Sequence, residues 1–329
     1  MTGLLWEQSA WQHDSRAWLA GSAAEIGRPL VGEIVQPRIR PWATLMHAPA
    51  AGGNLWFKAS GPGLAHEAAI TAALARWMPD ATPRVLAHDR ARSWLLMPDE
   101  GATLRDRMAE GAPGLSMHLA AERYANLQRE LAPRRVEMLA LGVPDCRLER
   151  LPRLYEDLLE DELLLSARDG TTDPPEVAQL RSAAPWVAAL CAELAAYGLP
   201  ETLQHDDLHS NNVFLRGEEP IIFDWGDSSI SHPLFSLLVL LRGAARDKDS
   251  SEGSPAVRSL RDAFLAAWDI LPDGAASGRL LAVATALARI NRAIAWRRAL
   301  QGVPEPYLSE FAPAVGAWLQ EFLEAAEAL

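Results

Sequence analysis

His205-Asp206-Asp207-Leu208-His209-Ser210-Asn211-Asn212 is followed, a few residues later, by Phe223-Asp224-Trp225-Gly226-Asp227. Polar side chains rarely gather in this way beside apolar segments unless they have a function. The apolar runs Val213–Leu215 and Ile221–Phe223 lie between the two stretches and flank a turn-forming segment, residues 216–220. This pattern predicts a small β-hairpin with polar residues at both of its ends.

The predicted hairpin brings together side chains from its two ends. Asn212 opens the first strand, Asp224 closes the second, and Asp207 lies on the loop that leads into the hairpin. Two carboxylates and one amide oxygen therefore converge, and hard oxygen ligands of this kind suit Mg²⁺. Phosphoryl transfer needs such a metal site, a carboxylate that accepts the hydroxyl proton, and a cation on the phosphates.

The spacing of these residues resembles that of the aminoglycoside phosphotransferase and choline kinase-like family, which shares the protein-kinase fold. The family pattern H-x-D-L-H-x-x-N is matched by His205, Asp207, Leu208, His209 and Asn212, and the I-D-W-G-D type element by residues 223–227. The resemblance implies that ATP is the phosphate donor, that Asp207 is the catalytic base, and that Asn212 and Asp224 bind Mg²⁺. It also implies that His205 and His209 position the loop. The simpler alternative is that these polar residues only form turns.

Lys58 and Glu67 support the same interpretation from the other half of the chain. Only Lys58 and Lys248 are lysines, so 29 of the 31 basic residues are arginine. Lys58 lies in an apolar strand-like segment, and Glu67 falls on an otherwise apolar face of the next predicted helix. A buried charge needs a partner, and kinases pair a strand lysine with a helix glutamate to position the nucleotide phosphates. The alternative is two unrelated surface charges.

The first hundred residues predict a five-stranded antiparallel sheet. The expected elements are a helix near Trp6–Ala24, strands Leu30–Val35, Trp42–Ala48 and Leu55–Ala59, a helix Ala65–Trp77, and strands Arg84–Ala87 and Ser93–Met97. By position and by the resemblance, backbone groups from Met97 to Asp99 form the hinge that binds adenine.

The segment Gln36–Pro41, expected to be the loop between the first two strands, lacks the glycine-rich pattern G-x-G-x-x-G of protein kinases. It contains Arg38 and Arg40 instead. We expect these arginines to face solvent, and contact with the nucleotide phosphates is the alternative.

From Thr103 onward the pattern is mostly helical. The expected helices are Ser116–Leu131, Leu148–Leu165, Glu176–Tyr197, Pro233–Ala245, Val257–Trp268, Arg279–Leu300 and Pro306–Leu329. The fold class expected is α+β, a two-lobed protein-kinase-like fold. Residues 1–100 would form a small nucleotide-binding lobe with an antiparallel sheet, and residues 101–329 a larger, mostly helical lobe for catalysis and substrate binding.

The composition is that of an ordinary globular protein, with 49% hydrophobic and 22% charged residues. A net charge of −12 argues against nucleic acid as the main partner. The two cysteines, Cys146 and Cys191, form no metal motif and favour a reduced, cytoplasmic protein. We identify no signal peptide at the start of the sequence and no apolar run long enough to span a membrane. The oligomeric state stays open.

The acceptor is expected to be a small molecule rather than a protein. Only a few residues separate Asp224 from the next predicted helix, too few for the activation segment of a protein kinase. Residues 1–100 are neutral overall and residues 101–329 carry the whole net charge. An aminoglycoside-like, amino-alcohol or sugar hydroxyl is therefore expected, on a molecule that could be cationic. The acids of Tyr155–Leu165 could attract an amine, although a solvated helix face is the favoured interpretation of that segment.

Two other functions stay open at this point. A metal-dependent phosphohydrolase could be built from His205, Asp206, Asp207 and His209, because histidines near aspartates can bind transition metals. That function leaves Lys58, Glu67 and Asp224 unexplained. A nucleotide-binding pseudokinase would usually lack the base, a metal ligand or the lysine, and this sequence has all of them. The fold does not fix the acceptor, the hydroxyl that is phosphorylated, or the choice between ATP and GTP.

Overall fold

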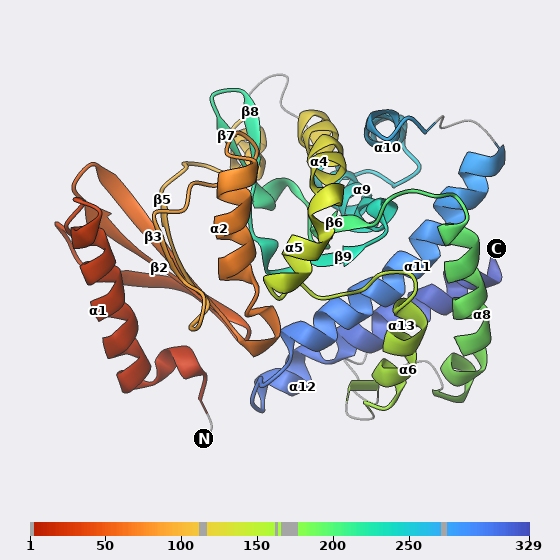
Figure 1. Cartoon of the computed structure of the whole chain (residues 1–329), viewed down its shortest axis with the longest axis horizontal. Coiled ribbons are helices and arrows are strands. Elements are labelled where there is room, and N and C mark those ends of the chain that lie inside the picture. The colour runs from red at the N-terminus through yellow and green to blue at the C-terminus, as the bar shows by residue number, and fades with distance from the viewer. Residues whose placement is uncertain (1–2, 112–116, 162–163, 166–176, 271–274) are drawn as a thin grey trace.

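The structure, a computed structural model, describes residues 3–111, 117–161, 164–165, 177–270 and 275–329. An antiparallel sheet with flanking helices forms the N-terminal part, and the C-terminal part is mainly helical (Figure 1). The predicted helices Ser116–Leu131, Leu148–Leu165 and Glu176–Tyr197 each extend into residues that lie outside the described ranges.

Five strands form the sheet in the order β1-β2-β3-β5-β4, and each neighbouring pair is antiparallel. They are β1 (Val35–Arg40), β2 (Ala43–Ala50), β3 (Gly53–Ser60), β4 (Ala87–Asp89) and β5 (Trp94–Pro98). Helices α1 (Ser9–Glu25) and α2 (Glu67–Trp77) lie on opposite sides of the sheet (Figure 1). The predicted five-stranded antiparallel sheet is therefore confirmed.

The alternation of side chains along β3 gives the sheet one apolar face and one functional face. Leu55 and Phe57 are fully buried on the face covered by α1, where the rings of Trp18 and Phe57 lie 5.7 Å apart. Lys58 points to the opposite face, because successive side chains of a strand alternate. There α2 brings Glu67 to the lysine.

The first strand differs from the prediction. Of the predicted strand Leu30–Val35, residues 30–34 contribute only an isolated bridge between Leu30 and Ala50, and β1 begins at Val35 and ends at Arg40. The predicted loop 36–41 contains two prolines, of which Pro37 lies on an edge strand, where a missing N–H is tolerated. The expected loop is therefore mostly strand, and residues 41–42 form the turn to β2.

The fourth strand was also predicted too early, because β4 covers Ala87–Asp89 rather than Arg84–Ala87. Its hydrogen-bonded partner β5 agrees closely with the prediction for Ser93–Met97.

In the C-terminal part, helices pack around a continuous apolar core. The described helices are α3 (Leu104–Ala109), α4 (Met117–Leu131), α5 (Arg135–Ala140), α6 (Leu151–Leu159), α8 (Val177–Ala195), α9 (Leu237–Asp247), α10 (Pro255–Ala267), α11 (Ala275–Ala299), α12 (Tyr307–Phe311) and α13 (Pro313–Glu327). The long helix α11 packs against α6, α8, α9 and α13, and it also reaches the 3-10 turn Pro62–Leu64 that precedes α2. It therefore connects the helical part to the sheet part (Figure 1).

Two predicted helices are shorter or divided. The predicted Pro306–Leu329 is two helices, α12 and α13, because Pro313 lacks an N–H and cannot continue the preceding helix. The predicted Pro233–Ala245 begins with a 3-10 turn over Pro233–Ser236, and α9 follows.

Two short antiparallel pairs complete the helical part. The predicted hairpin is present as β7 (Val213–Arg216) and β8 (Glu219–Ile222), and β6 (Thr202–Gln204) pairs with β9 (Ser229–Ser231). Among the helices of the described ranges, none combines the length and apolar character that a membrane span requires.

Candidate active site

A cleft of about 850 Å³ lies where the sheet meets the helical part. All seven residues predicted for the site line it: Lys58, Glu67, Met97, Asp99, Asp207, Asn212 and Asp224. They come from β3, α2, the end of β5, the loop before the hairpin, and the residues at the ends of β7 and β8. The tertiary structure thus gathers residues that span more than half of the sequence.

Lys58 lies between two carboxylates. Its Nζ is 2.5 Å from Glu67 Oε1 and 2.5 Å from Asp224 Oδ1, while Ser60 donates a hydrogen bond to Glu67 Oε2. Glu67 is almost fully buried, whereas the Asp224 side chain is 41% exposed and faces the cleft. We call Glu67, Lys58 and Asp224 the lysine triad.

The charge of Lys58 is stabilised within this triad. Burial by itself would lower the pKa of the amine, but the carboxylates of Asp224 and Glu67 outweigh it and raise the pKa above its ordinary value. Lys58 is therefore a permanent cation in the cleft at neutral pH.

Gly226 has a packing role beside the lysine triad. A Cβ at this position would lie 3.0 Å from Glu67 Oε2, so a side chain would crowd the carboxylate that holds Lys58. This close approach explains the glycine after Asp224 and Trp225.

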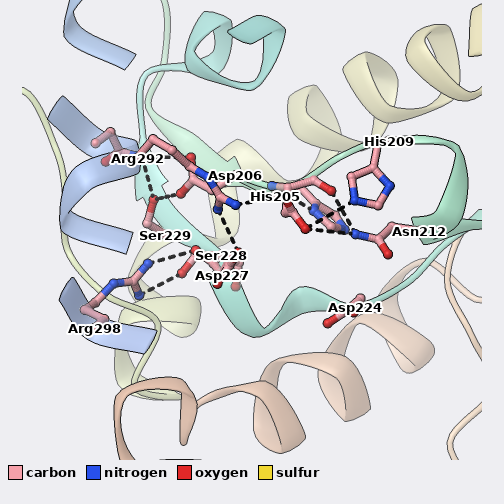
Figure 2. Close-up of polar contacts among 12 residues, drawn as sticks. His205, Asp206, His209, Asn212, Asp224, Asp227, Ser228, Ser229, Arg292 and Arg298 are labelled. Carbon is pink, nitrogen blue, oxygen red and sulfur yellow. Dashed lines mark hydrogen bonds and ion pairs between the residues drawn. The ribbon is translucent and has the colours of Figure 1, made fainter. Parts of the chain in front are cut away.

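The adjacent aspartates Asp206 and Asp207 have opposite surroundings. Asp206 has a φ of 61°, a left-handed conformation that aspartate tolerates. Its carboxylate accepts hydrogen bonds from Ser229 Oγ at 2.6 Å and Asn291 Nδ2 at 2.7 Å, inside the helical part (Figure 2). Burial raises the pKa of Asp206 to about 6. Asp206 does not line the cleft, whereas Asp207 does.

Asp207 is held by groups on three sides. Arg292 Nη2 donates to its Oδ1 at 2.8 Å, His209 Nε2 lies 3.4 Å from its Oδ2, and the amide of Asn212 donates to its main-chain oxygen at 2.8 Å. Burial opposes ionisation, but the Arg292 charge and the histidine overcome it and lower the pKa of Asp207 to about 2. The carboxylate is therefore ionised at neutral pH.

Arg292 is the main site residue that sequence reasoning missed. Its guanidinium joins Asp207 to Asp227, whose Oδ2 lies 2.7 Å from Nη1, and the arginine is only 8% exposed. We call Asp207, Arg292 and Asp227 the arginine triad. Arg292 lies on α11 among buried apolar residues. The reasoning used for Glu67, a charge on an apolar helix face, could have found it.

The arginine triad lies within a larger set of polar contacts made by α11. Arg298, further along the helix, donates to the main-chain oxygens of Asp227 at 2.8 Å and Ser228 at 3.2 Å (Figure 2). The segment that follows Asp224 is thereby fastened to α11, which also holds Asp206 through Asn291.

The two ends of the hairpin meet as expected. Phe223 N donates to Asn212 O at 3.1 Å, and His205 Nε2 is 2.8 Å from Phe223 O. His205 is fully buried and connects the loop to the hairpin. His209 Nδ1 accepts from the main-chain N–H of Asn211. Both histidines thus have contacts of the positioning kind that the resemblance implies.

The donor set at the hairpin ends fits Mg²⁺. Asp224 has an exposed carboxylate at the cleft, and the amide nitrogen of Asn212 is engaged by Asp207, which leaves the amide oxygen as the end available to a cation. Mg²⁺ is commonly bound by one or two protein oxygens together with substrate phosphates. In the described ranges there is no cluster of three or more histidine, cysteine or acidic residues of the kind that forms an all-protein metal site.

The predicted hinge is more constrained than expected. Met97 pairs with Trp56 in the sheet, and the N–H of Asp99 donates to Asn54 O at 3.1 Å. The Asp99 carboxylate accepts from Gly101 N at 2.9 Å. The Asp99 N–H of the predicted hinge is therefore engaged within the chain.

An antiparallel sheet joined to a mainly helical part, with a buried lysine–glutamate pair at the cleft between them, is the architecture of protein-kinase-like phosphotransferases. The model of the phosphotransferase enzyme family matches residues 55–281, which include every predicted site residue. The chain therefore belongs to the phosphotransferase enzyme family. A search of curated proteins found no match.

Solved structures support the fold. An ethanolamine kinase from Plasmodium vivax superposes with a TM-score of 0.61 at 11% identity, covering 97% of this chain and 89% of that one. A macrolide 2'-phosphotransferase from Brachybacterium faecium gives 0.56 at 16% identity, with 91% and 97% covered. An aminoglycoside phosphotransferase from Streptomyces rimosus, solved with ADP and streptomycin, gives 0.52 at 19% identity, with 85% and 98% covered. The predicted family and protein-kinase-like fold are confirmed.

Proposed function

We propose that this protein is an ATP- and Mg²⁺-dependent kinase that transfers the γ-phosphate to a hydroxyl of a small molecule. One observation carries the proposal: the lysine triad and the arginine triad face the same cleft, so a phosphate-binding cation and a hydroxyl-binding carboxylate lie at one site. This is the arrangement that phosphoryl transfer requires. The division into a nucleotide lobe, residues 1–100, and a catalytic lobe, residues 101–329, belongs to the same proposal.

Each residue has a role in the proposed reaction. Lys58 binds the nucleotide phosphates and Glu67 fixes its position, while Met97 and Asp99 flank the adenine. Asp224 and Asn212 would hold Mg²⁺, which would neutralise charge on the phosphates when bound. We also propose that the protein works in the cytoplasm, where ATP is available.

Asp207 would orient the acceptor hydroxyl and take its proton. The acceptor oxygen bonds to the γ-phosphorus as the bond from phosphorus to ADP breaks, and the proton that the hydroxyl gives up goes to Asp207. A carboxylate with a pKa near 2 is a weak base. The proton transfer should therefore follow the transfer of the phosphoryl group, once the acceptor oxygen has become acidic, and the earlier role of Asp207 is to orient the hydroxyl.

The acceptor is proposed only as a class: an aminoglycoside-like, amino-alcohol or sugar hydroxyl. The carboxylates of Asp207 and Asp227 do not select a cationic acceptor, because Arg292 already pairs with both of them. Nor do the acids of α6, since Arg153 pairs with Glu156 and Asp157 on the outer side of that helix.

The two alternatives have less support. A phosphohydrolase built on the His205–His209 loop would need Asp206 and His205 in the cleft, and both are buried and engaged elsewhere. A pseudokinase would require a defect in the site, and the site residues converge without one.

The test is an ATP-consumption screen of the purified chain against amino alcohols, aminoglycosides, macrolides and sugars, with Asp207→Asn as the matched control. The proposal expects one acceptor class to consume ATP in the wild type and to lose at least about 10²-fold in kcat in the variant. ATP binding without turnover of any acceptor would favour the pseudokinase. Phosphate release without an acceptor, retained in Asp207→Asn, would favour a hydrolase.

A further inference from the structure

We propose that Arg38 and Arg40, on the edge strand β1, bind the triphosphate of the nucleotide in place of the glycine-rich loop that the sequence lacks. This inference rests on the function proposed above. It reverses the expectation that these two arginines belong to a loop and face solvent.

The register of the sheet places both arginines on the face of Lys58. Arg38 pairs with Leu45, and Leu45 pairs with Lys58, so the three residues form one row across β1, β2 and β3. Residues directly opposite one another in a sheet share a face. Neighbouring strands are about 4.8 Å apart, so the Arg38 and Lys58 backbones are about 10 Å apart. Two long cationic side chains thus face the same space from either side of Leu45.

Arg40 lies two residues further along the same face. It pairs with Ala43, and Ala43 pairs with Ser60, which places Arg40 beyond Lys58 in the direction away from the hinge. The hinge row lies on the opposite side of the Lys58 row, where Trp56 pairs with Met97. A nucleotide whose base lies at the hinge would extend its phosphates along this face, past Arg38 and towards Arg40.

Both arginines line the cleft and neither is neutralised. In the described part of the chain, the lysine and arginine side chains that line the cleft are Arg38, Arg40, Lys58 and Arg292. Lys58 and Arg292 each bind two carboxylates. Among those described residues, the side chains of Arg38 and Arg40 have no hydrogen-bond or ion-pair partner, and both are exposed. They are therefore available for an anion.

The turn after Arg40 is fixed over the cleft by aromatic packing. The ring of Trp42 lies 5.5 Å from that of Trp296 on α11 and 4.9 Å from that of Phe311 on α12. Trp42 O accepts from Gly61 N at 2.7 Å, and Arg40 O accepts from Trp6 Nε1 at 2.8 Å. The end of β1 is thereby held at both sides, so Arg40 needs only side-chain movement to reach a ligand.

Two arginine side chains can supply the phosphate contacts that a glycine-rich loop makes in protein kinases. A glycine-rich loop covers phosphates with main-chain N–H groups, whereas a guanidinium offers a planar fork that binds phosphate oxygens in pairs. Arg38 and Arg40 would bind the outer side of the triphosphate, opposite the Mg²⁺ site proposed at Asn212 and Asp224.

Isothermal titration of nucleotides into the full chain tests this without knowledge of the acceptor. The proteins are wild type, Arg38→Ala, Arg40→Ala and the double variant, and the ligands are Mg·ATP, Mg·ADP and adenosine. Arg92→Ala is the matched control, because Arg92 is an exposed arginine of the same part of the chain and lies outside the cleft. Thermal melts verify that each variant is folded.

We expect Mg·ATP to bind about tenfold more weakly to each single variant and more weakly still to the double variant, as for loss of charge-assisted hydrogen bonds. The loss should be smaller for Mg·ADP and absent for adenosine, and Arg92→Ala should bind like wild type. Unchanged Mg·ATP affinity in the double variant would overturn the inference. So would an equal loss for adenosine, because that result would indicate a disturbed sheet rather than lost phosphate contacts.

The same titration separates the two proposals. If wild type binds none of the nucleotides, the proposed function fails and this inference fails with it. If wild type binds Mg·ATP and the double variant binds it equally well, only the inference about Arg38 and Arg40 fails.

Discussion

The lysine triad and the arginine triad are two versions of one motif that line the same cleft. In each, a buried cation lies between a carboxylate that is fixed by the fold and a carboxylate near the chemistry. Lys58 joins Glu67 to Asp224 across the two parts of the molecule, whereas Arg292 joins Asp207 to Asp227 within the helical part. The difference lies in the cation.

An ammonium is a compact point charge, and a guanidinium is a rigid fork. In the proposed function, Lys58 would exchange Asp224 for a phosphate oxygen and keep its position, because Glu67 would continue to hold it. Arg292 uses two separate nitrogens for its two carboxylates, so it fixes the angle between them. We infer from this comparison that the lysine triad suits a ligand that binds and is released in each turnover, and that the arginine triad holds Asp207 in a constant orientation.

The largest effect is expected from Asp224, the carboxylate that the lysine triad shares with the proposed Mg²⁺ site. Asp224→Ala removes the proposed Mg²⁺ ligand and one partner of Lys58, so turnover should be lost. Asn212→Ala should keep activity but require more Mg²⁺. The measurement is the initial rate against Mg²⁺ concentration, and wild-type activity of Asp224→Ala at limiting Mg²⁺ would refute the assignment.

A smaller effect is expected from the base itself. Asp207→Asn keeps the shape of the side chain but loses the basic oxygen, so kcat should fall about 10²–10⁴-fold with ATP affinity little changed. Lys58→Ala should weaken ATP binding as well, because it removes a phosphate contact and leaves Glu67 unpaired. Steady-state kinetics together with nucleotide titration distinguishes a loss of kcat alone from a loss of ATP affinity as well. Near-normal kcat in Asp207→Asn would exclude Asp207 as the base.

Replacement of Arg292 tests whether the site needs the planar guanidinium group of this residue or only its positive charge. Arg292→Met removes the cation that Asp207 and Asp227 share in a largely buried place, which should cost about 3–5 kcal/mol of stability, and misorientation of Asp207 should lower kcat about 10²-fold. Arg292→Lys keeps the charge but not the fork, and it should recover stability more than kcat. Equal recovery of both, measured by denaturant unfolding and by kinetics, would show that the angle between the carboxylates is unimportant.

The smallest effect concerns stability against pH at the two neighbouring aspartates. The pKa of Asp206 is raised from 3.8 to about 6 in the folded chain. Its contribution to the free energy of unfolding is therefore fully present below about pH 4 and is lost as the pH rises through 6. The shift corresponds to about 3 kcal/mol at most. The pKa of Asp207 is lowered to about 2, so its contribution is present above about pH 4 and is lost as the pH falls through 2.

Unfolding by denaturant at pH values from 4 to 7 measures the Asp206 effect. Asp206→Asn should flatten the fall in stability between pH 4 and 6, because the amide does not titrate. A slope that stays as steep in this variant as in wild type would assign the pH dependence to other groups.

Much of the site could be predicted from the sequence, because the patterns that indicate it involve residues close together in the chain. The spacing of Asp207, Asn212 and Asp224 around a short hairpin specifies their convergence whatever surrounds them. Lys58 and Glu67 are nine residues apart on a strand and the next helix, and each is a charge in an apolar context. Alternation and helical spacing therefore sufficed to pair them.

The first strand shows where local reasoning fails. The proline at position 37 argues against a strand in general, yet an edge strand has a side on which the missing N–H is not needed. Whether a segment lies at the edge is a property of the sheet, so Arg38 and Arg40 could be assigned to the cleft only once the register was known.

By itself, then, the sequence determined the two-part α+β fold, the hairpin that brings Asp207, Asn212 and Asp224 together, and the lysine–glutamate pair, since short-range geometry imposes each of them. Only the tertiary structure decided that Arg292, 85 residues beyond Asp207, is its partner, and that Asp206 is turned away from the cleft. It also decided the contact at Gly63, where a Cβ would meet the main-chain oxygen of Arg298 at 1.6 Å. These are contacts between elements distant in the chain, and their geometry is set by how helices and sheet pack rather than by any local pattern.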